Sequence, residues 1–221
     1  MSRLYNDQHR ELQDQFNSRE LADRIEDIAV ATEIADDAKG FIESRDMFFL
    51  STVDDAGRPT VSYKGGEAGN FVHVIDSTTI AFPSFDGNGM YYSMGNINGS
   101  AEIGMLFIDF EKPHRIRVQG KATVSANDPL LSLWKEAELV VRVTVSELWQ
   151  NCPRYIHRYQ KIKDSRYLPK AECETPVATW KRTEPVQDVL REHELKQVDD
   201  AGGAIPIEEW IGYIQSGDEK A

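Results

Sequence analysis

Residues 84–124 read SFDGNGMYYSMGNINGSAEIGMLFIDFEKPHRIRVQGKATV and contain the pattern that decides the fold. Gly87, Gly89 and Gly95 lie among small polar residues in the first part of this stretch. Glycines in such a setting let the backbone approach a ligand closely or take left-handed turns. The first part is therefore expected to be a loop whose backbone approaches a ligand or takes left-handed turns.

Two strands are expected directly after this loop. Residues 103–108, IGMLFI, form an apolar run too short for a helix and are expected to be a strand buried on both faces. Residues 115–119, RIRVQ, alternate instead. One face of this second strand is apolar, and the other carries Arg115, Arg117 and Gln119.

The flanking sequence adds hairpins to these two strands. Residues 47–53 and 60–64 are predicted to pair across the polar turn DDAGRP, and residues 70–75 and 79–82 across DSTT, with Pro83 ending the second hairpin at an edge. Another β-branched strand is expected at 139–145. Six or seven strands with hairpin spacing predict a mainly β protein, a small antiparallel barrel with helical covers.

Helices are expected outside the strands. Residues 4–38 are charged and amphipathic, with a helix restart after Asn17, and shorter helices are expected at 34–44, 128–136 and 206–214. We divide the chain into an N-terminal helical cover (1–37), a barrel domain (38–183) and a charged C-terminal extension (184–221).

Composition limits the function classes. The chain has 221 residues, is 40% hydrophobic and carries a formal net charge of -12. An acidic surface repels nucleic acid and anionic membranes, so neither is expected as a partner. The sequence has neither a membrane-spanning apolar stretch nor a signal-peptide pattern, which predicts a cytoplasmic protein.

Cys152 and Cys173 are too few for a disulfide framework, and the histidines lack metal-ligand spacing, so no metal site is expected. His73 is expected to be a satisfied core histidine.

The order of the motifs FLSTVDDAGRP, TVSYKGG, TIAFP, DGNGMYYSMGNI, IGMLFIDF and RIRVQGKATV resembles the FMN-binding split barrel of the pyridoxamine 5'-phosphate oxidase superfamily, over residues 38–152. The resemblance implies a six-stranded Greek-key split barrel. It also implies a homodimer with two FMN sites at the interface, each contacted by both subunits.

The resemblance also places the cofactor contacts. It implies that the flavin is lined by Thr60, Val61, Ser62 and Lys64. It implies that the ribityl chain and phosphate are surrounded by Phe82, Pro83, Asn88, Ser93 and Asn96. It also implies that the flavin or phosphate is reached by Arg115 and Gln119, from the outward face of their strand. A flavin phosphate carries about two negative charges, so an acidic protein must supply cations and donors for it. Lys64 and Arg115 are the candidates; the alternative for Lys64 is a solvated strand residue, and the alternative for Arg115 is a surface cation. Ser93 and Asn96 fit local helix capping as well.

The chain departs from the family pattern in two places. The loop holds Met90, Tyr92 and Gly95 where the family commonly has one or two arginines or lysines. In true pyridoxamine phosphate oxidases, paired Arg and His residues near the C-terminus hold the vitamin phosphate. This pattern is not found here, and the nearest features in the sequence are Trp180, Lys181 and Arg182. Oxidation of pyridoxamine phosphate is therefore disfavoured.

Two function classes follow from these observations. The first is an FMN-dependent oxidoreductase that transfers electrons or hydride to an unidentified small molecule, for which the cofactor supplies the chemistry. The substrate pocket is expected to be lined by Tyr63, His114, residues 149–157 and the N-terminal helix. Planar, apolar electron acceptors are expected as substrates, because this lining is mostly aromatic. The alternatives are a non-catalytic flavin or haem-binding protein for storage, sensing or stress, and a reductase that uses a deazaflavin in place of FMN.

Overall fold

The computed structural model describes residues 2–221. The chain divides into two compact units, of which the first ends at Gln160 and the second covers Lys161–Ala221. The boundary drawn from the sequence after residue 183 falls inside the second unit.

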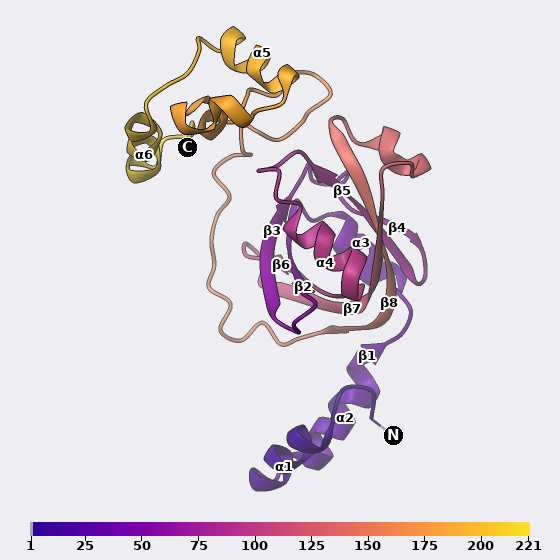
Figure 1. Cartoon of the computed structure of the whole chain (residues 1–221). Helices are drawn as coiled ribbons and strands as arrows, with labels where there is room; N and C mark the ends of the chain where they lie inside the picture. The colour runs from indigo at the N-terminus through magenta and orange to yellow at the C-terminus, as the bar shows by residue number, and fades with distance from the viewer. Residues whose placement is uncertain (1) are drawn as a thin grey trace. The chain divides into compact units, whose positions relative to one another are not determined.

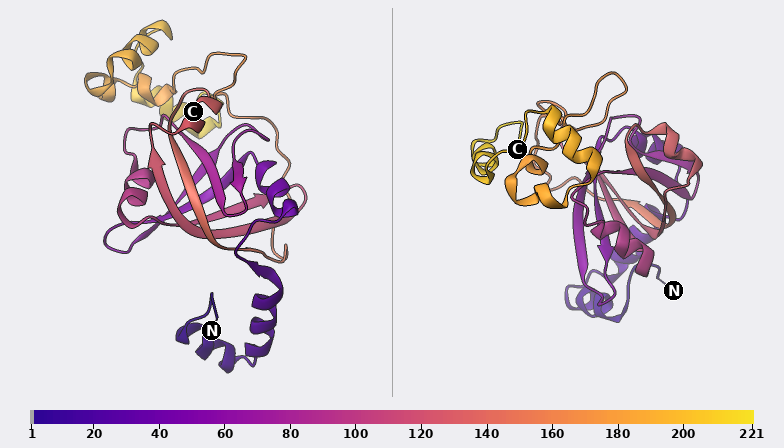
Figure 2. Two further views of the ribbon diagram at one scale, coloured as in Figure 1. Left: turned by 90° about the vertical axis from the view of Figure 1, so that its right-hand side faces the viewer. Right: turned by 45° about the horizontal axis from the view of Figure 1, so that its top comes forward.

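The first unit is built on one antiparallel sheet (Figure 1). Its strands are β1 (Val30–Ala31), β2 (Met47–Val53), β3 (Pro59–Gly65), β4 (His73–Asp76), β5 (Thr79–Phe85), β6 (Glu102–Asp109), β7 (His114–Ser125) and β8 (Ala137–Gln150). Their order is β3-β2-β6-β7-β8-β5-β4, and β1 pairs with β8. The sheet curls around its core, and β3 and β4 remain at the two ends of this order (Figure 2). The predicted antiparallel split barrel is confirmed, although its sheet has eight strands where six or seven were expected.

Aromatic side chains fill the inside of the curl. The ring of Phe48 lies 5.4 Å from Phe71, 4.9 Å from Phe82 and 5.1 Å from Phe107, measured between centroids. All four residues are buried. Burial alternates along β2, with every second residue turned into the core, as the period of a strand requires.

Three sequence-based expectations about these elements are wrong in detail. Gly104 and Leu106 are only half-buried, so β6 buries one face in this chain and not both. Pro83 does not end its strand, because β5 continues to Phe85 through pairing with β8, beyond the last residue that pairs with β4. The helix expected at 128–136 is instead a short 3-10 turn, η1 (Pro129–Leu133), and β8 follows from Ala137.

A glycine lets the longest strand pair bend. The register between β7 and β8 shifts between Gln119 and Gly120. A Cβ atom on Gly120 would lie 2.2 Å from the carbonyl oxygen of Thr144. The bulge therefore requires glycine, since any side chain would collide with the backbone of the neighbouring strand.

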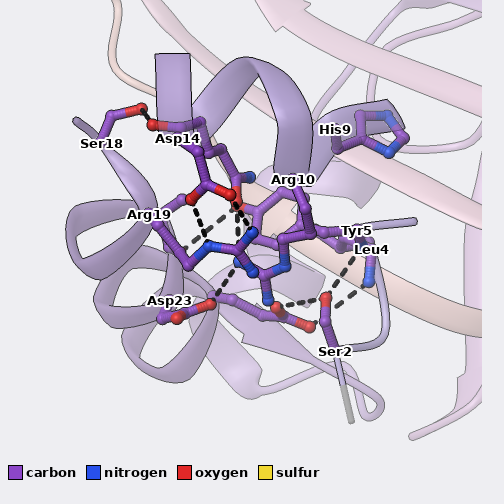
Figure 3. Close-up of polar contacts among 12 residues, drawn as sticks. Ser2, Leu4, Tyr5, His9, Arg10, Asp14, Ser18, Arg19 and Asp23 are labelled. Carbon is purple, nitrogen blue, oxygen red and sulfur yellow. Dashed lines mark hydrogen bonds and ion pairs between the residues drawn. The ribbon is translucent and has the colours of Figure 1, made fainter. Parts of the chain in front are cut away.

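The N-terminal segment is a pair of helices, α1 (Asp7–Gln15) and α2 (Arg19–Ala29). The predicted break falls at Asn17, where φ is 51°. Figure 3 shows the ion pairs that hold the two helices together: Arg10 to Asp23 at 2.6 Å and Arg19 to Asp14 at 2.5 Å. A third short helix, α3 (Asp36–Glu43), follows where the sequence predicted it.

The second unit consists of the 3-10 turns η2 (Thr179–Arg182) and η3 (Glu184–Val189) and the helices α5 (Glu192–Asp200) and α6 (Ile207–Ser216). A buried ion pair joins two of these elements, with Lys181 Nζ 2.6 Å from Glu194 Oε1. Arg191 also donates to Glu194, at 2.8 Å. Among residues 2–221, none of the helices is long and apolar enough to cross a bilayer.

Candidate functional site

Helix α4 (Tyr92–Ser100) follows the glycine-rich loop and contacts β2 and β7 (Figure 1). Met94 and Ile97 are buried on its inner side. The Asn96 amide donates to Thr52 Oγ1 at 3.0 Å, and Thr52 is itself buried. These contacts hold α4 against β2, and the first turn of the helix lines a shared cavity with β3 and the end of β5.

A cavity of about 240 Å³ lies at this junction, and we call it the serine-lysine cavity. Its lining comes from β3, the end of β5, the glycine-rich loop and the first turn of α4: Ser62, Lys64, Ser84, Phe85, Gly87, Asn88, Gly89, Met90, Tyr91, Tyr92, Ser93 and Met94. The structure thus brings together four residues that the resemblance placed at the cofactor, namely Ser62, Lys64, Asn88 and Ser93.

Lys64 is the cation of this cavity. Its side chain is half-buried, and burial lowers the pKa of its ammonium group below the ordinary lysine value. Within the described part of the chain the ammonium group has neither an ion pair nor a hydrogen bond. A partly desolvated cation without a counter-ion is unfavourable unless an anion binds beside it.

Two hydroxyls lie in the same cavity. Ser62 Oγ is 3.3 Å from Ser93 Oγ, and Ser62 Oγ also donates to the Leu50 carbonyl at 3.4 Å. Each hydroxyl has one hydrogen, so Ser93 can donate either to Ser62 or to a ligand oxygen, and Ser62 can donate to a ligand oxygen only by releasing the Leu50 carbonyl.

The first turn of α4 opens into the cavity. Tyr91 is the residue before the helix, and its side chain makes no hydrogen bond that caps the first turn. The leading amide groups of a helix lack acceptors within the helix, and the helix dipole favours negative charge there. Together with Lys64 and the two serines, this end of α4 has the donor set of a phosphate site.

Tyr91 has a strained backbone. Its φ is 46° and its ψ 28°, a left-handed conformation that is unusual for an aromatic residue and costs about 1–3 kcal/mol. Two contacts hold the turn. The Asn88 side chain accepts from the Met90 amide at 3.1 Å, and the Tyr91 hydroxyl donates to Glu138 Oε2 at 2.5 Å.

A second, more open cavity of about 640 Å³ lies beside Tyr91, and we call it the Glu138 groove. Its lining is Tyr91, Met94, Gly95, Asn98, Val124, Glu138 and Leu139. Tyr91 and Met94 line both cavities.

The other residues that the resemblance placed at the cofactor lie outside the serine-lysine cavity. Phe82 is in the aromatic core, Pro83 is buried beside it, and Asn96 is bonded to Thr52. Thr60 pairs with Thr52. Val61, Arg115 and Gln119 lie on the outer face of the sheet, where Val61 and Gln119 are exposed and Arg115 is half-buried with an unpartnered Nε. Their roles at a cofactor stay predictions.

Sequence reasoning missed several lining residues. Ser84 and Phe85 were missed because Pro83 was taken as the end of the strand, whereas β5 runs on into the cavity wall. Tyr91 was not predicted at the site, and its left-handed backbone has no sequence signal comparable with a glycine. The adjacent Gly89, which also has a positive φ, was the available hint of a turn.

Histidines do not contribute to the cavity lining. His73 packs on Trp134 with 5.3 Å between ring centroids, but its buried Nε2 lacks a hydrogen-bond partner within residues 2–221. The expectation of a satisfied core histidine is therefore wrong. In the same residues, groups of three or more His, Cys, Asp or Glu that could hold a metal ion are absent.

Comparisons with known proteins were made for the whole chain. The family model described as pyridoxamine 5'-phosphate oxidase matches residues 34–159. None of the curated proteins compared with the chain matches it.

Solved structures with a similar fold include HupZ of Group A Streptococcus, with 17% identity over 57% of this chain and 99% of that one, and a TM-score of 0.44. An FMN-binding protein from Syntrophomonas wolfei has 14% identity over 65% of this chain and 96% of its own, with a TM-score of 0.41. HutZ, the haem storage protein from Vibrio cholerae, has 14% identity over 53% and 94% of the two chains, and a TM-score of 0.40.

The family match covers more than half of the chain and includes every strand of the sheet except β1, together with α4 and the whole lining of the serine-lysine cavity. The antiparallel split barrel expected from the motif order agrees with it. This chain therefore belongs to the pyridoxamine 5'-phosphate oxidase family.

Proposed function

We propose that the serine-lysine cavity binds the phosphate of FMN and that the protein is a flavin-dependent oxidoreductase acting on a small molecule. The observation that carries this proposal is Lys64, a half-buried ammonium group that has no counter-ion among residues 2–221. It faces a cavity that also contains two hydroxyls and the first turn of a helix. A phosphate would satisfy all three kinds of donor at once.

The size of the cavity bears on how the rest of the cofactor would be held. Its volume of about 240 Å³ is below the roughly 300–1,000 Å³ typical of complete small-molecule sites. It suits a phosphate and part of a ribityl chain. The isoalloxazine ring would therefore extend beyond it, toward a surface that a second subunit would complete.

The outer face of the sheet offers such a surface. Val61 and Tyr63 on β3 are 66% and 63% exposed, and Tyr63 is paired across the sheet with Phe49. Phe49 is in turn paired with the half-buried Leu106 on β6. A contiguous apolar face of this kind is commonly buried in a partner, so we propose a homodimer through it.

Arg115 and Gln119 share this outer face, on β7. In the proposed dimer they would approach the cofactor of the partner subunit. This arrangement would replace the arginines or lysines that the glycine-rich loop lacks.

When bound, the flavin supplies the electron or hydride transfer. The residues of this chain would bind and orient it. Lys64 would supply the positive charge beside the phosphate, and Ser62 and Ser93 would supply hydrogen-bond donors. The glycine-rich loop, whose turn is held by Asn88, would cover the cofactor. The lining contains Tyr91 and Tyr92 but neither an acid nor a histidine, so we assign it no residue for proton transfer.

Titration of FMN into the flavin-free protein, followed by flavin fluorescence, tests the proposal. We expect about one FMN per chain. Lys64→Ala should weaken binding by about 1.5–3 kcal/mol, the range for hydrogen bonds to charged groups, and Arg115→Ala should also weaken it. Absence of FMN binding to folded protein would refute the proposal, and the absorbance spectrum of the purified protein separates FMN from a deazaflavin or haem.

A further inference from the structure

Helices α1 and α2, which we call the N-terminal hairpin, contact each other through charged side chains and turn their apolar side chains outward. Ion pairs of Arg10 with Asp23 and of Arg19 with Asp14 join the two helices (Figure 3). The helix period places the apolar residues away from these ion pairs. All five large apolar residues of the hairpin are exposed: Leu12, Phe16, Leu21, Ile25 and Ile28.

Such a hairpin lacks the packing that normally stabilises helices. α1 has 9 residues and α2 has 11, and over these described lengths neither helix contains a buried residue. Helices shorter than about 12–15 residues are marginal in water by themselves, and exposed ion pairs add little to their stability. Phe16 and Ile28 are each 71% exposed. We therefore expect a partner surface to cover this apolar face.

The charges beside the apolar face indicate which kind of surface it fits. Glu20 and Asp27, with Arg24 between them and the apolar residues, lie along one border of this face on α2 and are exposed. Among residues 2–221, the carboxylates of Glu20 and Asp27 have neither an ion pair nor a hydrogen bond. Helices that lie on anionic membranes have polar faces rich in Lys and Arg, whereas this hairpin has more acidic than basic residues. A protein surface with a cation beside apolar groups fits better.

The outer face of the sheet carries a surface of this kind. The strand registers place five residues side by side across β3, β2, β6, β7 and β8, and we call them the outer row: Tyr63, Phe49, Leu106, Arg117 and Trp149. Leu106 and Trp149 flank Arg117 and are half-buried, while Arg117 is exposed. In the described residues 2–221 the guanidinium group of Arg117 has neither an ion pair nor a hydrogen bond.

The hairpin is attached at one end of the outer row. Val30, the first residue after α2, pairs with Trp149. Within one chain the hairpin leaves its own row uncovered, since its five apolar residues remain exposed. The proposed homodimer brings the outer faces of two copies together, so the hairpin of each copy begins at the border of that interface.

Charge decides between two ways of covering the hairpin with a second copy. Two hairpins docked on each other would bring the carboxylates of Glu20 and Asp27 from both copies together, and like charges at an interface are unfavourable. The outer row instead offers the opposite charge at Arg117, with apolar neighbours on both sides.

We propose that the N-terminal hairpin of each copy docks on the outer row of a second copy of this chain, with its apolar face on Leu106 and Trp149 and its acidic border next to Arg117. The inference rests on the proposed homodimer and adds an arm exchanged between the two subunits. It gives Arg117, which the proposed flavin site does not use, a role in holding this arm. Folding of the hairpin then depends on dimer formation.

Photo-cross-linking in mixed dimers tests the exchange directly. Phe16 is replaced by benzoylphenylalanine, a photoreactive residue that keeps the aromatic ring, and full-length protein labelled with heavy isotopes is mixed with unlabelled protein. We expect cross-linked peptides that join a heavy chain to a light one, between the hairpin and residues 102–125 or 137–150. Cross-links confined to single chains, or absence of mixed cross-links, would overturn the proposal.

Substitutions at matched isoleucines measure the contribution to dimer stability. Ile28→Ser should raise the dimer dissociation constant at least about tenfold in analytical ultracentrifugation, because each subunit loses one buried apolar side chain. Ile162→Ser is the control, since Ile162 is 95% exposed and lies outside the hairpin. Equal effects of the two substitutions would contradict the docked hairpin. Flotation of the protein with phosphatidylglycerol vesicles that Ile28→Ser abolishes would assign the face to a lipid surface instead.

Charge reversal tests the contact at Arg117. Arg117→Glu should weaken the dimer about tenfold, and adding Glu20→Lys with Asp27→Lys should recover most of this loss. If the reversals only add to one another, the acidic border does not lie beside Arg117, and the docking is wrong.

FMN titration of the same samples keeps this inference distinct from the proposed function. A dimer that binds FMN but gives no mixed cross-links would overturn only the exchanged hairpin. Mixed cross-links in a dimer that does not bind FMN would refute only the flavin site.

Discussion

Ser62 and Ser93 are 31 residues apart in the sequence, and their hydroxyl oxygens are 3.3 Å apart in the structure. The contact joins strand β3 to the first turn of α4. It also lies in the same cavity as Lys64, so donors from two distant segments converge on one small volume.

Replacing either serine by alanine tests whether this contact serves a ligand or the fold. We expect Ser62→Ala and Ser93→Ala to weaken FMN binding by about 0.5–1.5 kcal/mol each, the usual contribution of a hydrogen bond. The melting temperature of the flavin-free protein should change little, because the bond is half-exposed and long. A large loss of stability with normal FMN affinity would assign the pair to the fold.

The charged ammonium group of Lys64 should lower the free energy of unfolding of the flavin-free protein. Burial lowers the pKa of this lysine, so the folded protein holds the proton less firmly than the unfolded chain does. Stability should therefore rise with pH from the lowered pKa up to the ordinary value of about 10.4. Lys64→Met should raise the melting temperature at neutral pH, remove this pH-dependent rise and weaken FMN binding.

The exposed Lys112 provides the matched control for that experiment. Lys112→Met removes the same charge from the surface and should leave both FMN affinity and stability nearly unchanged. If Lys64→Met destabilised the flavin-free protein instead, the ammonium group would have a stabilising partner, contrary to our reading of the cavity.

The proposed dimer face can be disrupted by one charge. Tyr63→Glu places a carboxylate on the apolar outer face of β3 and should convert the dimer to a monomer in analytical ultracentrifugation, with weaker FMN binding. Tyr155→Glu is the control, since Tyr155 is 88% exposed and lies outside the sheet. A wild-type protein that is monomeric at micromolar concentration with flavin bound would contradict the shared site.

The second unit should be sensitive to acid. Hydrogen bonds from Arg191, together with Lys181, lower the pKa of Glu194 well below its usual range, although burial opposes them. The stabilisation from this carboxylate is complete above the unfolded-state pKa of about 4.3 and is lost as the pH falls below it. Glu194→Gln removes the carboxylate that pairs with the buried Lys181 and should cost about 3–5 kcal/mol at neutral pH.

Tryptophan fluorescence during an acid titration measures this effect, and Lys196→Gln gives an exposed ion-pair control. In the wild type we expect a transition below about pH 4, which should move to higher pH or disappear in Glu194→Gln. A variant as stable as the wild type at neutral pH would show that the buried pair does not hold η2 to α5.

Gly120 and Gly40 form a matched pair of glycine substitutions. Gly120→Ala puts a methyl group 2.2 Å from the Thr144 carbonyl oxygen and should destabilise the sheet by several kcal/mol, about the upper end for single substitutions. Gly40→Ala, in α3, meets open space and should stabilise by about 0.5–1 kcal/mol. Chemical denaturation measures both, and equal effects would contradict the bulge.

Much of the fold follows from local sequence patterns. The strand-forming composition of 47–53, the alternation of apolar residues in 115–119 and the polar turn between 53 and 60 correctly predicted β2, β7 and the first hairpin. Local residue preferences and the period of a strand are sufficient for these predictions. The helix break at Asn17 was also correct. These features need no knowledge of distant contacts.

The sequence by itself therefore determined the strands, their hairpins and, through the order of its motifs, the family. Tertiary structure alone decided that Ser62, Lys64 and Ser93 share a cavity while Asn96 is used to anchor α4 on Thr52. It also decided that Tyr91 takes a left-handed backbone and reaches Glu138, 47 residues away. The physical reason is that a strand period fixes which face a residue is on, whereas the curl of the sheet decides which distant faces meet.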